Sequence, residues 1–329
     1  MLTFIIARIL QAIPVLLVVG FIAYAMFAFI GDPVVIMLGQ NHMEAERLAL
    51  VNQLGLDQPF FVQYARFMVA ALHGDLGISY RVARPVADLL VERLPATLEL
   101  AFTASVLALL VGLPMGVYTA IYRNSWLSRV FMVFSLIGVS LPTFLIGILL
   151  ILCFSVILGW LPSFGRGEVV HIGSWWTMGL LTQSGLKALI MPSITLGLFQ
   201  MTLITRLVRA EMLEVLRSDY IKFARARGLS SRAIHFGHAL KNTLVPVITI
   251  VGLQLGGVIA FSIVTETVFQ WPGMGLLFVQ SVGVADIPVM SAYLLLIALF
   301  FVFINLIVDL LYFAVDPRLR LARGGIGAR

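Results

Sequence analysis

The stretch SDYIKFARARGLSSRAIHFGHALKNTLVP, from Ser218 to Pro246, is the longest strongly basic interruption in an otherwise apolar chain. Apolar segments long enough to span a membrane lie on both sides of it. A polar segment of about 30 residues between two spans must lie in water, and its basic character places it on the cytoplasmic side of the membrane. Its cationic and histidine residues are Lys222, Arg225, Arg227, Arg232, His235, His238 and Lys241.

Two helical pieces are expected within this stretch. The residues from Tyr220 to Arg227 contain no helix breaker, and they are followed by Gly228, a residue type common at helix C-caps. Arginines in the last turn interact favourably with the helix dipole. Ser230 or Ser231 can cap a second piece that runs to about Asn242. The sequence therefore predicts a helix–turn–helix that lies against the membrane and presents one face to a soluble partner.

The composition excludes an ordinary soluble domain. The 329 residues are 60% hydrophobic and 12% charged, with a mean hydropathy of +1.03, whereas soluble domains are about 25% charged. A net charge of +6 is better explained by the charge asymmetry of membrane loops than by nucleic-acid binding. The single cysteine, Cys153, lies in an apolar segment, so neither a disulfide nor a multi-cysteine metal site can form within this chain.

Six transmembrane helices are expected. The first runs from about Ile9 to Ile30, a length of roughly 33 Å that is enough to cross a bilayer. It is too long for the apolar part of a signal peptide, and no small-residue cleavage site follows it, so we expect a retained helix. The other five are expected at about 98–122, 130–158, 188–208, 244–269 and 289–314.

Positive charges are distributed unevenly between the two sets of loops. The short outer loops hold only Arg166 and Lys187. This asymmetry predicts that both termini lie in the cytoplasm. Besides the basic stretch, the cytoplasmic segments would hold Arg8, Arg123, Arg129, Arg206, Arg209, Arg318, Arg320, Arg323 and Arg329.

The segment 31–96 is polar compared with the spans and predicts an extracytoplasmic insertion with two amphipathic helices. The first covers Glu44 to Leu54 and ends at Gly55, and the second covers Pro59 to Leu72. Aromatic residues recur at helical spacing in the second helix. They either rest on the membrane surface or the helical bundle, or they contact a substrate or partner. These residues are Phe60, Phe61, Tyr64 and Phe67.

The chain thus divides into four parts. An N-terminal transmembrane helix (1–30) and the insertion (31–96) precede a five-helix core (97–314), and a cytoplasmic tail (315–329) follows. Within the core, Pro114, Pro142 and Pro192 each remove a backbone hydrogen bond and can kink their helices, and a purely packing role is the alternative. The glycines at 252, 256 and 257 favour close helix contact, either within the chain or across a subunit boundary.

Several dispersed runs resemble one family of membrane proteins. The runs A-R-A-R-G-L-S at 224–230 and H-A-L-K-N-x-L-x-P at 238–246 are similar to B-type permease subunits of the dipeptide/oligopeptide (peptide/nickel) family of ABC importers. The match to the general E-A-A-x-x-x-G pattern of importers is partial, because Lys222 and Phe223 replace the Glu and the first Ala. Further similar runs are G-D-P at 31–33, L-G-L-D-Q-P-F at 54–60, H-G-D-L-G-I-S at 73–79, E-R-L-P-A-T-L-E-L at 92–100, T-E-T-V-F-Q-W-P-G-M-G at 265–275 and D-P-R-L-R at 316–320.

The resemblance implies an all-α polytopic membrane protein with a permease fold like that of ABC type I importers. The stretch 218–246 resembles the coupling loop of that family, which docks on an ATPase subunit. We therefore expect Ala224 and Gly228 to allow close docking, Leu229 to supply an apolar contact, and Arg225 and Arg227 to make charge contacts. The alternative for the two arginines is binding to lipid headgroups of the inner leaflet.

The function implied by the resemblance is that of a transmembrane permease subunit in an ATP-driven importer. It would move dipeptides or oligopeptides across the bacterial or archaeal cytoplasmic membrane by alternating access. The implied partners are a C-type second permease subunit, two ATP-binding subunits and an extracytoplasmic substrate-binding protein. Because the same family includes nickel and glutathione importers, these substrates are alternatives.

No motif in the sequence predicts catalysis. The chain lacks the phosphate-binding G-x-x-x-x-G-K-S/T, the zinc-binding H-E-x-x-H and the nucleophile motif G-x-S-x-G. His235 and His238 lie one turn apart, but no third metal ligand is evident. We therefore expect no active site, metal or cofactor in this chain, with ATP bound and hydrolysed by partner subunits.

Four polar residues in the spans are candidates for lining a translocation path, namely Gln200, Gln254, Glu266 and Asn305. Hydrogen bonds between helices explain the three amides equally well. For Glu266, the alternative is to cap a re-entrant turn. The absence of a row of buried acids argues against an ion-coupled secondary carrier, which remains the alternative of a different class.

Overall fold

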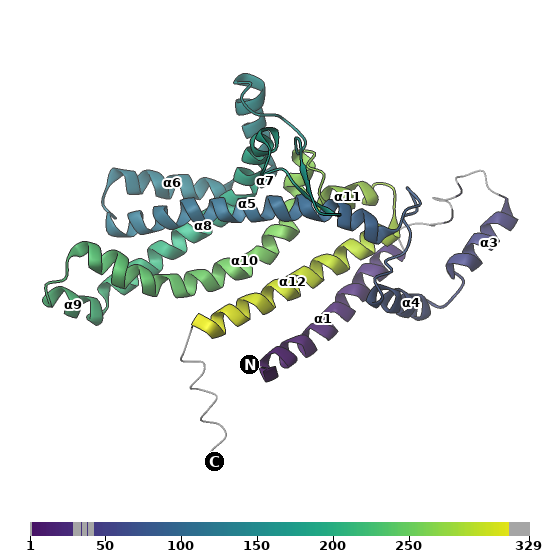
Figure 1. Cartoon of the computed structure of the whole chain (residues 1–329), viewed down its shortest axis with the longest axis horizontal. Coiled ribbons are helices and arrows are strands. Elements are labelled where there is room, and N and C mark those ends of the chain that lie inside the picture. Colours follow the sequence, from purple (N-terminus) through teal and green to yellow (C-terminus); the bar gives the residue numbers. More distant parts are fainter. Residues whose placement is uncertain (1, 29–33, 35–37, 39–42, 316–329) are drawn as a thin grey trace, which may run out of the picture.

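Long helices make up most of the structure, which is a computed structural model that describes residues 2–28, 34, 38 and 43–315 (Figure 1). The G-D-P run at 31–33 and the arginines after residue 315 lie outside the described residues. Five described helices are long and apolar enough to cross a membrane, or six if one bent pair counts as a single span. The five are α1 (Leu2–Ala28), α5 (Val86–Ile121), α8 (Gln183–Arg217), α10 (Leu240–Val268) and α12 (Ile287–Val315).

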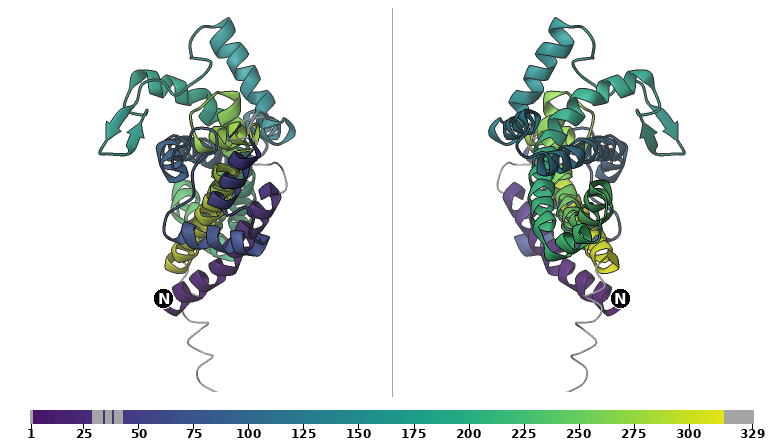
Figure 2. Two further views of the ribbon diagram at one scale, coloured as in Figure 1. Left: turned by 90° about the vertical axis from the view of Figure 1, so that its right-hand side faces the viewer. Right: turned by 90° about the vertical axis from the view of Figure 1, so that its left-hand side faces the viewer.

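The bent pair is the third expected span. α6 (Trp126–Ser140) is followed by α7 (Thr143–Leu150) and a π-helical segment, η1 (Ile151–Ile157), and the two halves meet at 112°. Pro142 lies at the junction, where it precedes the first residue of α7. Proline lacks an N–H donor and disfavours helical geometry at the residue before it, so the predicted kink here is a complete break. The second half projects away from the bundle (Figure 2).

A small hairpin interrupts the otherwise helical chain. β1 (Val170–Ile172) pairs antiparallel with β2 (Trp176–Met178), with His171 opposite Thr177. Gly173, in the connecting turn, has a φ of +73°, a conformation that favours glycine. The all-α expectation missed this element, because three-residue strands are too short to show a pattern of alternation.

α5 and α8 pack closely at the centre of the bundle. A Cβ atom on Gly112 of α5 would lie 2.9 Å from the carbonyl oxygen of Met201, and one on Gly197 of α8 would lie 2.7 Å from that of Ala104. Both positions therefore need glycine, as is typical where membrane helices touch through their backbones. Figure 1 shows α10 beside this pair and α12 beside α10.

The predicted glycine contact of the fifth span lies within the chain. Gly252 faces Val308 and Gly256 faces Phe301, so α10 packs its small residues against α12. Gly257 differs, because a Cβ there would meet only Gln254 Oε1, at 3.8 Å. One part of this glycine surface is therefore left open.

The first span lies against α12 (Figure 1). Arg8 Nε lies 2.9 Å from Asp309 Oδ2, which joins the start of α1 to the last turns of α12. α1 and α12 are thus antiparallel neighbours, and their free ends lie on the same side of the molecule.

The described part of the insertion contains α3 (Glu44–Leu54) and α4 (Phe60–Leu72), as expected. The aromatic residues of α4 pack on α1. Phe21 makes ring contacts with Phe61 and Tyr64, and the Tyr64 hydroxyl donates a hydrogen bond to the Leu17 carbonyl at 2.6 Å. Tyr24 donates to Gln63 Oε1 at 3.0 Å. In this structure the aromatic residues therefore rest on the helical bundle, the first of the two sequence alternatives.

Asp286 attaches the end of the insertion to the start of α12. It is 2% exposed, and its carboxylate accepts hydrogen bonds from the Ser79 hydroxyl at 2.5 Å and the Tyr80 backbone N–H at 3.0 Å. Burial, with the Tyr24 hydroxyl and the Asp286 charge, raises the pKa of Tyr80 to about 12. The H-G-D-L-G-I-S run thus ends in a contact that holds two distant segments together.

Candidate functional site

A short helix, α9 (Asp219–Ala226), follows α8 directly and lies at one end of the molecule (Figure 1). Its bounds agree with the predicted first piece of the basic stretch. Ile221 is fully buried, and Ala224 is 6% exposed. Both belong to a core cluster that also contains Met212 of α8 and Ile234. Burying an isoleucine contributes about 1.5–3 kcal/mol, so the apolar side of α9 is attached firmly to the long helices.

A polar contact holds α9 from a second direction. The Tyr220 hydroxyl accepts a hydrogen bond from Asn242 Nδ2 at 2.6 Å and donates one to the His238 carbonyl at 3.2 Å. Both partners belong to the segment that enters α10. α9 therefore contacts two spans, α8 and α10, so a displacement of α9 would move both of them.

The second predicted piece is not a separate helix. A π-helical segment, η2 (Ala233–Ala239), runs without interruption into α10. Ser230 accepts a hydrogen bond from the Ala233 backbone N–H at 3.3 Å, the capping role considered for it. The expected end of this piece near Asn242 is wrong. No glycine or proline lies between Asn242 and Pro246, and Pro246 itself is inside α10, so the helix continues into the fifth span.

The outward side of α9 combines exposed aromatic and cationic side chains. Phe223 is 65% exposed and Leu229 is 39% exposed. The Arg227 guanidinium carbon lies 5.8 Å from the centre of the Phe223 ring, within the range of a cation–π contact. Arg225 is also exposed. We call Phe223, Arg225, Arg227, Gly228 and Leu229 the α9 outer face.

Four of the five residues expected to contact an ATPase are thus on the surface, and Ala224 is not. Its methyl group lies in the core cluster, so its small size serves packing within this chain. Gly228 has a φ of +79° with open space around its Cα, so its conformation rather than crowding requires glycine here. The sequence did not single out Phe223, which is the most exposed of the large apolar residues in α9.

His235 is partly buried beside the charge of Arg225. Burial, and to a lesser extent the Arg225 charge, lowers the pKa of His235 below its ordinary value. Both effects favour the neutral form of the His235 imidazole.

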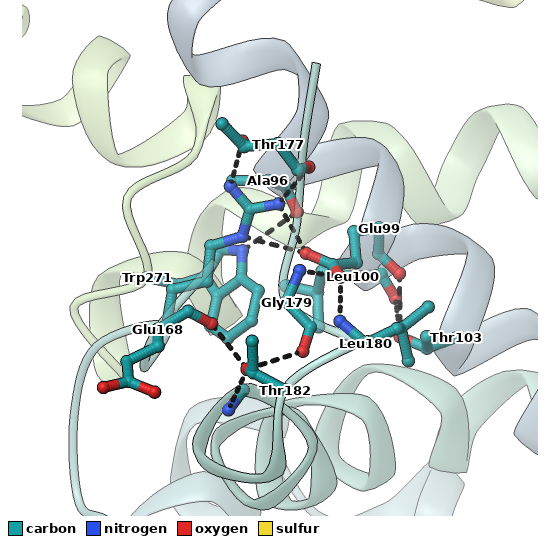
Figure 3. A network of polar contacts seen from close by, with 12 residues as sticks. Ala96, Glu99, Leu100, Thr103, Glu168, Thr177, Gly179, Leu180, Thr182 and Trp271 are labelled. Carbon is teal, nitrogen blue, oxygen red and sulfur yellow. Dashed lines mark hydrogen bonds and ion pairs between the residues drawn. The ribbon is translucent and has the colours of Figure 1, made fainter. Parts of the chain in front are cut away.

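A second polar site joins α5 to the hairpin, and its contacts are drawn in Figure 3. It lies in the half of the bundle that also contains α11 (Met274–Val282), away from α9 (Figure 1). Glu99 of α5 is paired with Arg166, whose Nε and Nη2 lie 2.8 and 2.5 Å from Glu99 Oε2. Glu99 Oε1 accepts hydrogen bonds from the backbone N–H groups of Gly179 and Leu180 at 2.7 and 2.8 Å. Arg166 also donates to the Thr177 side chain and carbonyl.

This network has a structural role. Both charged side chains are at least nine-tenths buried, and their polar atoms are hydrogen-bonded to one another or to the hairpin. It therefore holds the hairpin of β1 and β2 against α5. The sequence contained one clue, a glutamate near the start of a span and a single arginine in the following outer loops, but only the fold brings them together.

Glu266 lies in the same half of the bundle and is fully buried. Its Oε1 accepts hydrogen bonds from the Thr97 and Ser262 hydroxyls at 2.7 and 3.0 Å, and its Oε2 accepts one from the Leu276 backbone N–H at 2.9 Å. It thus caps the first turn of α11, which is the alternative given for it from the sequence. A Cβ on Gly273 would collide with the Glu266 carboxylate, which explains a glycine at that position.

The three amides occupy two separate places. Gln200 and Gln254 line one pocket between α8 and α10. Asn305 lies apart from them, in the groove between α1 and α12 that also contains Arg8 and Asp309. The structure thus brings together only the first two of the four candidate path residues.

Comparison with known families covers almost the whole chain. The family described as binding-protein-dependent transport system inner membrane component matches residues 112–321, and the N-terminal family of the same membrane components matches residues 1–101. Together with the apolar helices, these matches define a polytopic membrane transport component. The chain belongs to the family of binding-protein-dependent transport system inner membrane components, and it is a permease component of ABC transport.

Individual proteins are similar over their full length. The glutathione transport system permease protein GsiC of Escherichia coli O6:H1 is 40% identical over 322 residues, which cover 97% of this chain and 99% of that one. The dipeptide transport system permease protein DppB of Alkalihalophilus pseudofirmus is 37% identical over 332 residues, with 97% and 100% covered. The predicted family is therefore confirmed.

A solved structure supports the fold. A chain of the MetNI methionine ABC transporter, in an inward-facing conformation, is similar with a TM-score of 0.55 and 22% identity. The alignment covers 69% of this chain and 96% of that one. The predicted permease fold is thus confirmed for the helical core.

Proposed function

We propose that this chain couples ATP hydrolysis in separate subunits to the import of small peptides. The observation that carries the coupling proposal is the attachment of α9. Ile221 and Ala224 are buried in the core, Tyr220 is bonded to the start of α10, and the opposite side of the helix is exposed. A helix that is fixed to two spans and open on its outer side can transmit a rigid-body displacement.

The α9 outer face would bind an ATP-binding subunit. Aromatic and arginine side chains are enriched at protein interfaces, and this face has both. Its arginines would pair with acidic groups of that subunit, in preference to lipid headgroups. ATP can drive transport in such an assembly only by binding one of its conformations more tightly than the other.

The partners in the proposed assembly are a second permease of the C type, two ATP-binding subunits and an extracytoplasmic substrate-binding protein. α9 and both described ends of the chain would lie on the cytoplasmic side of the cytoplasmic membrane, with α11 and the hairpin on the outer side. The antiparallel contact of α1 with α12 supports placing the ends together.

The proposed substrates are dipeptides or oligopeptides. Similarity to both a dipeptide and a glutathione permease supports a substrate with peptide bonds. Nickel is the less favoured alternative, because both of these relatives are named for peptide-like substrates.

Gentle detergent extraction followed by mass spectrometry tests the assembly. We expect a second permease and one or two ATP-binding subunits to co-purify with this chain. Its binding protein can then be screened against dialanine, glutathione and Ni²⁺. If the chain purifies alone or as a homo-oligomer and transports substrate in liposomes without ATP, the proposal is wrong and an ion-coupled carrier is the better explanation.

A further inference from the structure

We propose that the pocket between α8 and α10 is a peptide-binding subsite in which Gln200 and Gln254 recognise the backbone amides of the passing substrate. This inference rests on the proposed peptide transport and adds the residues that contact the peptide. The pocket has a volume of about 300 Å³, at the lower end of the range found for small-molecule sites.

The first observation is an unsatisfied buried amide. Gln200 is 2% exposed, and neither its Oε1 nor its Nε2 has a hydrogen-bond partner. Leaving a buried amide unpaired carries a substantial energetic penalty, which an apolar side chain of similar size would avoid. The glutamine is therefore best explained by a partner that is bound during part of the transport cycle.

The second observation is the depth of the pocket. Gln200 is the middle residue of α8 and Gln254 is the middle residue of α10. Both helices are long enough to cross a bilayer, and each glutamine also lies near the middle of the apolar run expected for its span, 188–208 or 244–269, which places the two amides near the bilayer midplane. Substrate sites of membrane transporters commonly lie at this depth, where water offers polar groups the least compensation.

The third observation is the convergence of polar groups from three elements. Thr143 of α7 lines the same pocket, directly after the break at Pro142. Gln254 Oε1 lies beside Gly257, on the part of the α10 glycine surface that α12 does not cover. The remaining lining is apolar and includes Phe199 and Phe261. A few convergent polar groups in an apolar pocket are the usual composition of a ligand site.

The polar and apolar groups that line the pocket indicate the class of substrate that it would bind. A carboxamide offers both an N–H donor and a carbonyl acceptor, which together complement the two polar groups of a peptide bond. Hydrogen bonds to the peptide backbone do not depend on which side chains the peptide carries. The apolar walls of the pocket can accommodate many different side chains. The described lining contains no Asp, Glu, His or Cys, so it suits a peptide better than a nickel ion.

The test uses the complete transporter in liposomes, with radiolabelled dialanine as the probe. Gln254→Leu and Gln200→Leu remove the carboxamides at nearly constant volume. We expect assembly and ATP hydrolysis to persist while dialanine uptake at subsaturating concentration falls about three- to tenfold, the ratio expected for one lost hydrogen bond. Gln254 is only partly buried, so its variant reports on the pocket independently of the fully buried Gln200.

Thr195→Val is the matched control. Thr195 lies on α8 and is fully buried, but its hydroxyl bonds to the Met191 carbonyl of its own helix at 2.9 Å, and it does not line the pocket. Uptake by this variant should stay within about twofold of the wild type, since only a local bond is lost.

Two results would overturn the subsite. In the first, uptake is unchanged in both glutamine variants of a correctly assembled transporter. In the second, the variants lose the second permease during purification, which would mean that the amides pair with that subunit. A wild-type assembly that hydrolyses ATP but transports neither dialanine nor glutathione would instead overturn the proposed function itself, and the subsite with it.

Discussion

At the scale of single residues, Gly228 has two possible reasons to be glycine, namely its backbone conformation and its place on a contact surface. Its φ of +79° favours glycine, and no atom lies near the position of a Cβ. Asparagine tolerates this conformation far better than valine does. The two substitutions therefore distinguish a requirement for the conformation from a requirement for a bare surface.

We expect Gly228→Asn to preserve expression but to lower ATP-dependent uptake several-fold, because the new side chain would project from the α9 outer face into the proposed contact with the ATP-binding subunit. Gly228→Val should add about 1–2 kcal/mol of local strain. Gly74→Asn is the control, since Gly74 has a φ of +82° and open space in the segment after α4. Normal uptake by both Gly228 variants at normal expression would contradict docking at this residue.

The buried pair of Glu99 and Arg166 belongs to the same scale. Removing one partner of a buried ion pair costs about 3–5 kcal/mol, because the other charge is left without compensation. Arg166→Met should therefore lower the melting temperature of the purified transporter markedly. Glu99→Gln with Arg166→Met should cost less than the sum of the two single changes, because they share one interaction.

The exposed pair of Arg84 and Glu92 provides the comparison. Its closest N–O distance is 3.3 Å, and both side chains are more than half exposed. Arg84→Met should change stability by less than about 1 kcal/mol, as surface ion pairs do. Equal melting temperatures for the Arg84 and Arg166 variants would show that the network in Figure 3 does not stabilise the hairpin.

At the scale of elements, α9 has two sides with different roles. Ile221 is fully buried on one side and Phe223 is 65% exposed on the other. Ile221→Ala should cost about 2–5 kcal/mol through the cavity it leaves, and both the attachment of α9 and uptake should decline.

Phe223→Ala should leave the melting temperature of this chain unchanged while it lowers co-purification of the ATP-binding subunit and ATP-dependent uptake. The physical reason is that an exposed ring contributes to a partner contact rather than to the core. Thermal melting, pull-down and uptake on the two variants measure the difference. If Phe223→Ala retains the ATP-binding subunit and full uptake, the α9 outer face is not the docking surface.

At the scale of the whole molecule, the membrane topology of the chain can be measured, that is, the side of the membrane on which each loop lies. Ser174 lies in the turn of the hairpin and Ser231 lies beside α9, and both are exposed. In a Cys153→Ser background, Ser174→Cys should react with a membrane-impermeant maleimide on intact cells without an outer membrane. Ser231→Cys should react only after the membrane is opened. The reverse pattern would contradict cytoplasmic termini.

The positions of the spans were largely predictable from the sequence. Apolar runs of membrane length are expected near 98–122, 188–208, 244–269 and 289–314. These runs fall within α5, α8, α10 and α12 respectively, and none of them overruns its helix by more than one residue. The helices also extend beyond these runs, as α5 does at its start, Val86, because polar residues continue a helix into water without changing its hydrogen bonds. The complete break at Pro142 was underestimated, since a proline can also be tolerated within a helix, as Pro114 and Pro192 are.

The sequence by itself determined the membrane class, the positions of most spans, the basic stretch between two of them and the family, because hydropathy, charge and short motifs are local properties. Only the tertiary structure decided which side of α9 is free, that Glu99 pairs with Arg166, that Glu266 caps α11, and that Gln200 and Gln254 share a pocket while Asn305 does not. Those contacts join residues far apart in the chain. Their partners depend on helix rotation and packing, which close approach at small residues such as Gly112 and Gly197 sets in three dimensions.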